Sequence, residues 1–369
     1  MDPAEIEARG LYDPDAANAD GRLELLEWLA GRGVTVDEMV DAHERGQLVA
    51  LAGDLARAGS GPRLTVAEVA ELAGVSPEFV GRAMQATGFP PPDPYIHQFS
   101  PDDAELFRTV AMATELFGIE PTTQFARVIG ASLARIAEAA SSLFLVNVEG
   151  PLREQHASEL ELAQSQLLAI EQAGAINQVL DSLFRHHFDE AIRRNRLARG
   201  SSMSVEMARL AVGFVDLIGF TRLSRELSTR DLASVVTDFE STATDLVARR
   251  DGRLVKLIGD EAMYVTVSAA DACEIALELC QYVEDHTMLD RARGAVAVGA
   301  LVARDGDYYG PLVNLASRAV KLAEPGCVLV TEEVRGEAEA SADLSFGDAV
   351  TRELRGFDEP VSLSVVTPA

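Results

Sequence analysis

Two acidic turns in the second half of the chain could place carboxylates side by side. Asp216 ends an apolar run and precedes a Gly turn and a predicted helix, whose first N–H groups, near Phe220 and Thr221, could hold an anion. Asp260 lies at the tip of a predicted hairpin in KLIGDEAMYV. Two carboxylates that converge from adjacent turns can share a pair of Mg²⁺ ions in phosphoryl or nucleotidyl transfer. Ordinary turn residues would explain either aspartate alone, but not Lys256 within the apolar run of the hairpin.

A predicted helix further along the chain carries an amide and a guanidinium. Asn314 and Arg318, in GPLVNLASRAVK, are four residues apart and therefore lie on one helical face. These two groups can position a ribose and neutralise phosphate charge. If this pair stood alone, a polar, solvated helix face would be the favoured interpretation.

The elements that must position these residues alternate between strands and helices from about residue 204 onward. The sequence predicts an apolar strand in MARLAVGFVDLIG, then a helix, the hairpin, a second helix and a strand in RGAVAVGALVAR. This order predicts an α+β fold, a ferredoxin-like palm with additions. In such a palm the hairpin pairs beside the strand that ends at Asp216, so the two acidic turns would converge.

The first 203 residues have a different, mostly helical pattern. Residues 1–148 predict an all-α domain, and LTVAEVAELAGVSPEFVGRAM within it resembles a winged helix-turn-helix, with Ser100 as the N-cap of a later helix. DNA binding is not favoured, because the second helix of this segment carries a single cation, Arg82, beside Glu78. Residues 149–203 predict a helical linker, and residues 204–369 the α+β domain.

The whole chain has 369 residues, with 32 basic and 59 acidic side chains and a formal net charge of −27. Such a charge disfavours nucleic acid and anionic membranes as partners. Three cysteines form no disulfide framework and favour a reducing compartment. The longest apolar stretch, residues 125–148, is interrupted by charged side chains. We therefore expect a soluble, cytoplasmic protein without a membrane partner.

Taken together, FVDLIGFT, KLIGDEAMYV and GDYYGPLVNLASR closely resemble the catalytic domain of class III nucleotidyl cyclases, over roughly residues 205–366. The resemblance implies two Mg²⁺ or Mn²⁺ ions per site, bound by Asp216, Asp260 and the backbone carbonyl of Leu217, where isoleucine is commoner in the family. It implies that Lys256 and Asp307 select the purine. The remaining residues that match family positions are Asn314 and Arg318, which would orient the ribose and stabilise the transition state, and Arg293 and Arg355, which would contact phosphate.

The reaction that this resemblance implies is the conversion of ATP to 3′,5′-cyclic AMP and pyrophosphate. A Lys donor and an Asp acceptor match the N1 acceptor and N6 donor of adenine. In this family the metal-binding aspartates of one protomer face the purine-selecting pair of the other, so we expect a homodimer with two complete sites. Two alternatives stay open: a guanylate cyclase, which Lys256 and Asp307 disfavour, and a catalytically inactive, cyclase-like DNA-binding regulator.

The N-terminal half also resembles the helical regulatory half of mycobacterial soluble class III cyclases, some of which respond to pH. Histidine is the side chain whose charge changes most readily near neutral pH. His186 and His187 lie in the predicted linker, and His156 lies near its start. One hypothesis is that their protonation shifts the linker between two packings. Ordinary solvated helix histidines are the competing interpretation.

Overall fold

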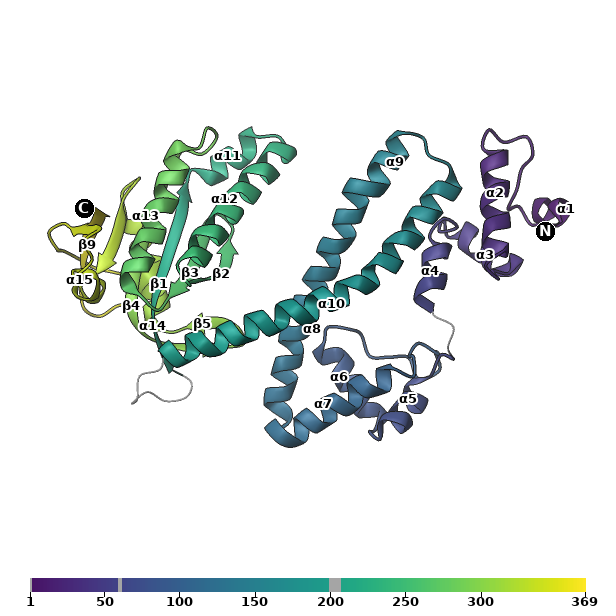
Figure 1. The fold of residues 1–369 in the computed structure, drawn as a ribbon, viewed down its shortest axis with the longest axis horizontal. Coiled ribbons are helices and arrows are strands. Elements are labelled where there is room, and N and C mark those ends of the chain that lie inside the picture. The colour runs from purple at the N-terminus through teal and green to yellow at the C-terminus, as the bar shows by residue number, and fades with distance from the viewer. Residues whose placement is uncertain (1, 59–61, 199–206) are drawn as a thin grey trace. The chain divides into compact units, whose positions relative to one another are not determined.

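The computed structural model of the protein describes residues 2–58, 62–198 and 207–369 (Figure 1). The chain divides into two compact units, Met1–Arg185 and His186–Ala369, and each is described by itself. The predicted three-part division, with boundaries after residues 148 and 203, stays a prediction. The predicted linker contains the longest described helix, α10 (Glu159–Ala198), which continues across the boundary between the two units.

The first unit begins with four helices around one apolar core. The core is built from buried side chains that include Leu25, Leu26, Leu29 and Met39. A capping box starts the third helix, because the Thr35 hydroxyl accepts a hydrogen bond from a backbone N–H of the first turn. The four helices are α1 (Pro3–Ala8), α2 (Ala19–Ala30), α3 (Val36–Glu44) and α4 (Leu51–Ala58).

The predicted helix-turn-helix segment forms two helices and packs on a third. Gly74, with φ of +73°, ends the first of these helices in the left-handed conformation, as the Gly-Val turn predicts. The prediction that Ser100 is the N-cap of the last of these three helices is wrong. That helix begins after Asp102, and Ser100 instead donates hydrogen bonds to the Asp103 carboxylate. The helices are α5 (Val66–Ala73), α6 (Pro77–Ala86) and α7 (Asp103–Phe117).

A long apolar helical segment follows, Ile119–Glu154, made of α8 (Ile119–Phe144), a π-helical turn (Leu145–Glu149) and α9 (Gly150–Glu154). Within the described ranges it is the one helix whose length and composition would allow it to cross a membrane, with a mean hydropathy of 1.4. Only 6% of its apolar 18-residue window is buried. The helix runs without a break through the charged residues at 127, 135 and 138. The expected absence of a membrane partner stays a prediction.

The second unit, teal through green to yellow in Figure 1, is built on one mixed sheet. The sheet confirms the α+β palm, because the strand that carries Asp216 lies between the hairpin and the next long strand. The strands run in the order β2 (Arg253–Ile258), β3 (Glu261–Thr266), β1 (Met207–Ile218), β4 (Arg291–Arg304), β6 (Val328–Thr331), β9 (Val361–Pro368) and β7 (Leu344–Phe346). The short strands β5 (Asp307–Tyr309) and β8 (Val350–Arg352) pair with β4 and β9.

Side chains of β1 alternate between two cores, as the period of a strand requires. Ala211 and Val215 pack with α12 (Thr229–Arg249) and α13 (Ala269–Asp285), whereas Val212 and Phe214 pack on the opposite face with α14 (Pro311–Ala319). Asp216 is an even number of residues from Val212 and Phe214, so it lies on the same face of the sheet as they do, the face that α14 covers. The remaining helices are α11 (Phe220–Glu226), the 3₁₀ turn η2 (Val320–Leu322) after α14, and α15 (Glu332–Ala338).

Candidate active site

Three charged residues form a row across the centre of the sheet. Asp216 on β1 is the register partner of Glu261 on β3 and of Arg293 on β4. Directly paired residues project from the same face of a sheet, and the apolar residue two positions inward on each strand lies in the α14-side core. The strand register therefore brings two carboxylates and a guanidinium together at the end of this core.

The buried carboxylate of Asp216 binds a different cation at each oxygen. Arg293 donates from Nε and Nη2 to Oδ2, at 2.9 and 2.8 Å. Lys321, in the 3₁₀ turn after α14, donates from Nζ to Oδ1 at 2.7 Å. Only 7% of the Asp216 side chain is exposed, and an unpaired charge buried to this degree would be costly, so the two cations offset that cost.

Glu261 is buried beside Asp216 and is less well compensated. Its Oε1 lies 3.2 Å from Lys321 Nζ, but this ion pair lacks hydrogen-bond geometry, and Oε1 has no hydrogen-bond donor among the described residues. Burial raises the pKa of the Glu261 carboxyl, the Lys321 ammonium opposes this rise, and the charges of Asp216 and Asp260 add to it. Glu261 Oε1 thus has an ion pair with Lys321 but no hydrogen bond, so its charge is only partly compensated.

The two acidic turns are joined by a backbone hydrogen bond, as the palm predicts. The Leu217 N–H donates to the Asp260 carbonyl at 3.0 Å. Gly259, with φ of +67°, provides the left-handed residue that the tight hairpin turn needs. Asp260 is half-buried, and its charge influences the Glu261 carboxyl. Asp216, Glu261 and Asp260 therefore lie within electrostatic reach of one another.

A second cluster contains Lys256 and Asp307. Lys256 Nζ donates to Asp307 Oδ2, and the Asp307 Oδ1 atom accepts from the Tyr308 N–H at 2.8 Å. Burial alone would raise the pKa of the Asp307 carboxyl, but the hydrogen bonds from Lys256 and Tyr308 and the Lys256 charge lower it overall. A register shift between Leu254 and Lys256 on β2 accompanies this arrangement. A preformed donor and acceptor are therefore held side by side.

The Asn314 and Arg318 side chains lie on α14, as predicted. Asn314 is exposed, while Arg318 is half-buried and places its guanidinium carbon 5.3 Å from the ring centroid of Phe357. Arg355 lies two residues before Phe357 in the loop between β8 and β9, where its side chain is exposed. This end of α14 and that loop are thus in contact.

These clusters remain separate within one chain. Among the described residues, no hydrogen bond or ion pair joins the Asp216 row to Lys256–Asp307, or either of them to Asn314 and Arg318. Arg293, the predicted phosphate contact, pairs with Asp216 instead. Their shared functional roles stay predictions.

Sequence reasoning did not identify Glu261 or Lys321 as members of the site. Glu261 follows Asp260 directly, but only the strand register places it opposite Asp216. Lys321 lies seven residues after Asn314, a spacing that returns to the same helical face. That spacing was the one available signal for Lys321.

The remaining predicted residues lie outside these contacts. Phe220 and Thr221 begin α11, after Gly219 in the left-handed conformation. His186 and His187 are exposed on α10, and His156 is exposed in the turn between α9 and α10, with φ of +58°.

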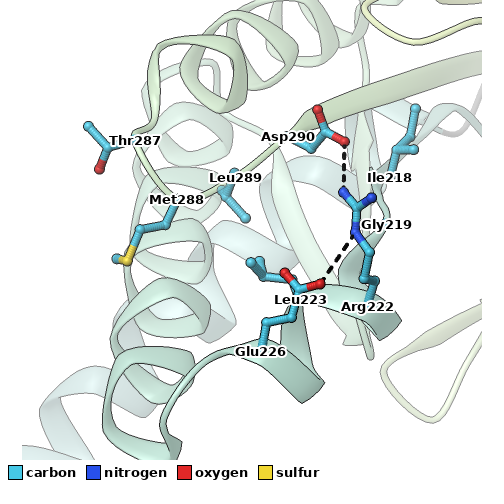
Figure 2. Close-up of a pocket in the computed structure, with 9 residues that line it drawn as sticks. All are labelled: Ile218, Gly219, Arg222, Leu223, Glu226, Thr287, Met288, Leu289 and Asp290. Atoms are coloured by element: carbon cyan, nitrogen blue, oxygen red, sulfur yellow. Dashed lines mark hydrogen bonds and ion pairs between the residues drawn. The ribbon is translucent and has the colours of Figure 1, made fainter.

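A small pocket of about 130 Å³ lies beside α11, between the turn after β1 and the loop before β4. Figure 2 shows the residues that line it. The Arg222 guanidinium lies between the carboxylates of Asp290, at 3.5 Å, and Glu226, at 4.0 Å. The residues that line this pocket include none of the predicted site residues. Arg222 is thus already paired, and the pocket does not contain the chemistry described above.

Two family models match the chain: an adenylate cyclase regulatory domain over residues 4–192, and an adenylate and guanylate cyclase catalytic domain over residues 203–356. A protein named pH-sensitive adenylate cyclase from Mycobacterium tuberculosis is 31% identical over 93% of this chain and 87% of its own length. The chain belongs to the class III adenylate cyclases. An adenylate cyclase from Streptomyces coelicolor is 33% identical, over 79% of this chain and 76% of its own length.

This family membership confirms the resemblance predicted from the catalytic motifs, and it assigns the helical N-terminal half to a regulatory domain family. Among solved structures, the adenylyl cyclase CyaB of P. aeruginosa is 23% identical to this chain. The match covers 44% of this chain and 95% of the CyaB chain, with a TM-score of 0.40.

Proposed function

We propose that this adenylate cyclase converts ATP to 3′,5′-cyclic AMP and pyrophosphate at a homodimer interface, with two Mg²⁺ or Mn²⁺ ions per site. The observation that carries the choice of nucleotide is the ion pair between Lys256 and Asp307. It holds one donor and one acceptor together, the combination that adenine requires at N1 and N6. Guanine presents the reverse pattern, so it would leave both groups mispaired.

The metal-binding residues in this proposal are Asp216, Asp260 and the carbonyl of Leu217. The donor set fits a hard cation, because it consists of oxygens and lies beside the unsatisfied Oε1 of buried Glu261. Among the described residues, no three acidic, His or Cys side chains are grouped as a preformed metal site, so substrate phosphates and water would complete the coordination. When bound, the ions supply Lewis-acid stabilisation of the attacking and leaving oxygens.

The other residues would bind and orient the nucleotide. Asn314 would fix the ribose so that its 3′-hydroxyl faces the α-phosphorus, and Arg318 would neutralise charge that develops on the phosphate. Arg293 and Arg355 would contact the phosphates, and the amides near Phe220 and Thr221 would hold phosphate oxygens.

The homodimer is supported by the separation of the clusters within one chain. If Asp216 and Asn314 serve the same nucleotide, and one chain does not join them, a second copy would supply the missing half. Two variants test this directly: Asp216→Ala and Asn314→Ala, each inactive when assayed alone. A mixture should recover about a quarter of the wild-type rate, because half of the dimers would be mixed and each would have one intact site. A mixture that stays inactive would contradict the shared site.

Nucleotide specificity is tested by assaying the purified full chain with Mn²⁺ and either ATP or GTP. We expect cyclic AMP as the main product, with GTP turned over at least about a hundredfold more slowly. Preference for GTP would favour the guanylate cyclase alternative. No turnover of either nucleotide would favour an inactive regulator.

We further propose that the N-terminal half regulates a cytoplasmic enzyme and that pH is the stimulus. The name of the pH-sensitive relative and the exposed positions of His186 and His187 support this. Comparison of residues 204–369 with the full chain would measure the sign of the regulation. The double variant His186→Ala/His187→Ala should flatten the pH–activity profile, whereas His97→Ala, an exposed histidine elsewhere, should not.

A further inference from the structure

We propose that Lys321 is an internal counter-cation, which occupies the carboxylate pair of Asp216 and Glu261 and must leave it before a divalent metal ion can bind there. The inference rests on the proposed metal role of Asp216. It adds a residue that sets how much metal the enzyme needs.

The geometry of Lys321 is that of a cation between two ligands. Its Nζ lies 2.7 Å from Asp216 Oδ1 and 3.2 Å from Glu261 Oε1, so one ammonium bridges carboxylates from two neighbouring strands. A divalent ion that used the same two oxygens would lie in the same space. Because two positive charges cannot share that space, occupation by the ammonium and by the metal exclude each other.

The two cations beside Asp216 differ in how firmly they are held. Arg293 makes two hydrogen bonds to Asp216 Oδ2 and a third, at 2.9 Å, to the carbonyl of Lys321, and 24% of its side chain is exposed. The Lys321 side chain is 49% exposed, and its long stem can carry the ammonium into solvent. Arg293 can therefore keep one oxygen neutralised while Lys321 gives up the other.

The composition of the chain points to the same residue. Of the 32 basic side chains only two are lysines, Lys256 and Lys321, and the other 30 are arginines. Both lysines pair with carboxylates in the two catalytic clusters. A lysine ammonium is a compact point charge, whereas an arginine fork would hold Asp216 through two parallel bonds and would be harder to displace. A removable cation at position 321 thus calls for lysine.

The test measures binding of Mn²⁺ alone to the full-length protein, without nucleotide, by the electron paramagnetic resonance signal of free Mn²⁺. Lys321→Met keeps the length of the side chain and removes its charge. We expect it to bind Mn²⁺ on the order of tenfold more tightly than the wild type. Lys321→Arg keeps the charge in a form that is harder to displace, and it should bind Mn²⁺ more weakly than the wild type.

The matched control is Lys256→Met, which removes the other lysine and leaves Asp216 and Glu261 untouched. Its Mn²⁺ affinity should equal that of the wild type. Circular dichroism would establish that each variant is folded. Equal, measurable affinity in the wild type, Lys321→Met and Lys321→Arg would overturn the counter-cation but leave the proposed metal site standing. No Mn²⁺ binding at millimolar concentration by any of these proteins, Lys321→Met included, would also overturn the counter-cation, whereas the proposed metal site, which the substrate phosphates complete, would then depend on the activity assay of Asp216→Ala.

Discussion

At the residue scale, Asp216 is a buried charge with three donors from two cations, and the proposed chemistry depends on it. Asp216→Asn keeps the shape of the side chain and removes the negative charge. We expect the rate of cyclic AMP formation to fall by at least about a hundredfold, because metal binding and phosphate positioning both need the carboxylate. Initial rates at saturating Mn²⁺ would measure this.

A matched control for that variant is Asp290→Asn. Asp290 is a nearby, largely exposed carboxylate that pairs with Arg222 at 3.5 Å, outside the clusters. Its loss should change the rate by less than about twofold, since exposed ion pairs contribute little. A similar loss of activity in both variants would show that general electrostatics, not Asp216, is responsible.

The pair of Asp307 and Lys256 predicts a pH dependence of stability. Because the pKa of Asp307 is lower in the folded state, its ionised form stabilises the fold above its unfolded-state pKa, near 4, and this contribution is lost as the pH falls through the folded-state pKa. Asp307→Asn should therefore lower the Tm at pH 7, and the difference from the wild type should shrink as the pH falls below the unfolded-state pKa, near 4. Thermal melts across this range would test the sign.

At the element scale, β1 and β3 are locked by one close approach. A Cβ at Gly213 would lie 2.0 Å from Cζ of Tyr264, whose ring is fully buried and whose hydroxyl donates to the Ala272 carbonyl. Gly213→Ala should therefore destabilise the catalytic unit by about 2–4 kcal/mol, through overpacking. Gly336→Ala, in α15 with open space around it, should leave stability unchanged or raise it by about 0.5–1 kcal/mol. Urea denaturation of both variants would compare them.

The elements themselves were largely predictable from the sequence, but their register was not. The apolar run before Asp216, the Gly turn at Gly259 and the helix that carries Asn314 appear where the pattern predicts them. The partners of Asp216 do not follow from that pattern, because β1 and β3 are buried on both faces and show no alternation that would fix their alignment. Only the strand register of the sheet therefore identifies Glu261 as the neighbour of Asp216.

Lys321 shows a different limit of sequence reasoning. It lies in a 3₁₀ turn just beyond α14, where helical periodicity tightens and face assignments become uncertain. The cap predicted at Ser100 fails for a separate reason, because the Ser100 N–H and hydroxyl donate to the carboxylate of Asp103 instead of the hydroxyl accepting from the helix.

At the scale of the whole molecule, the net charge of −27 acts against the proposed homodimer. Two such chains repel each other at low ionic strength, and salt screens that repulsion over a Debye length of about 10 Å at 0.1 M. We expect the dimer Kd to fall several-fold between about 50 and 300 mM NaCl. Sedimentation velocity at both salt concentrations would measure it, and a Kd that rises with salt would contradict the prediction.

The scarcity of lysine has a practical consequence for handling the enzyme. Besides the amino terminus of the chain, amine-reactive dyes and resins have two attachment points, Lys256 and Lys321. Coupling through them would modify the two proposed catalytic clusters directly. Thiol coupling at partly exposed Cys327 avoids this, since burial raises the pKa of the Cys273 and Cys280 thiols to about 12 and leaves them unreactive.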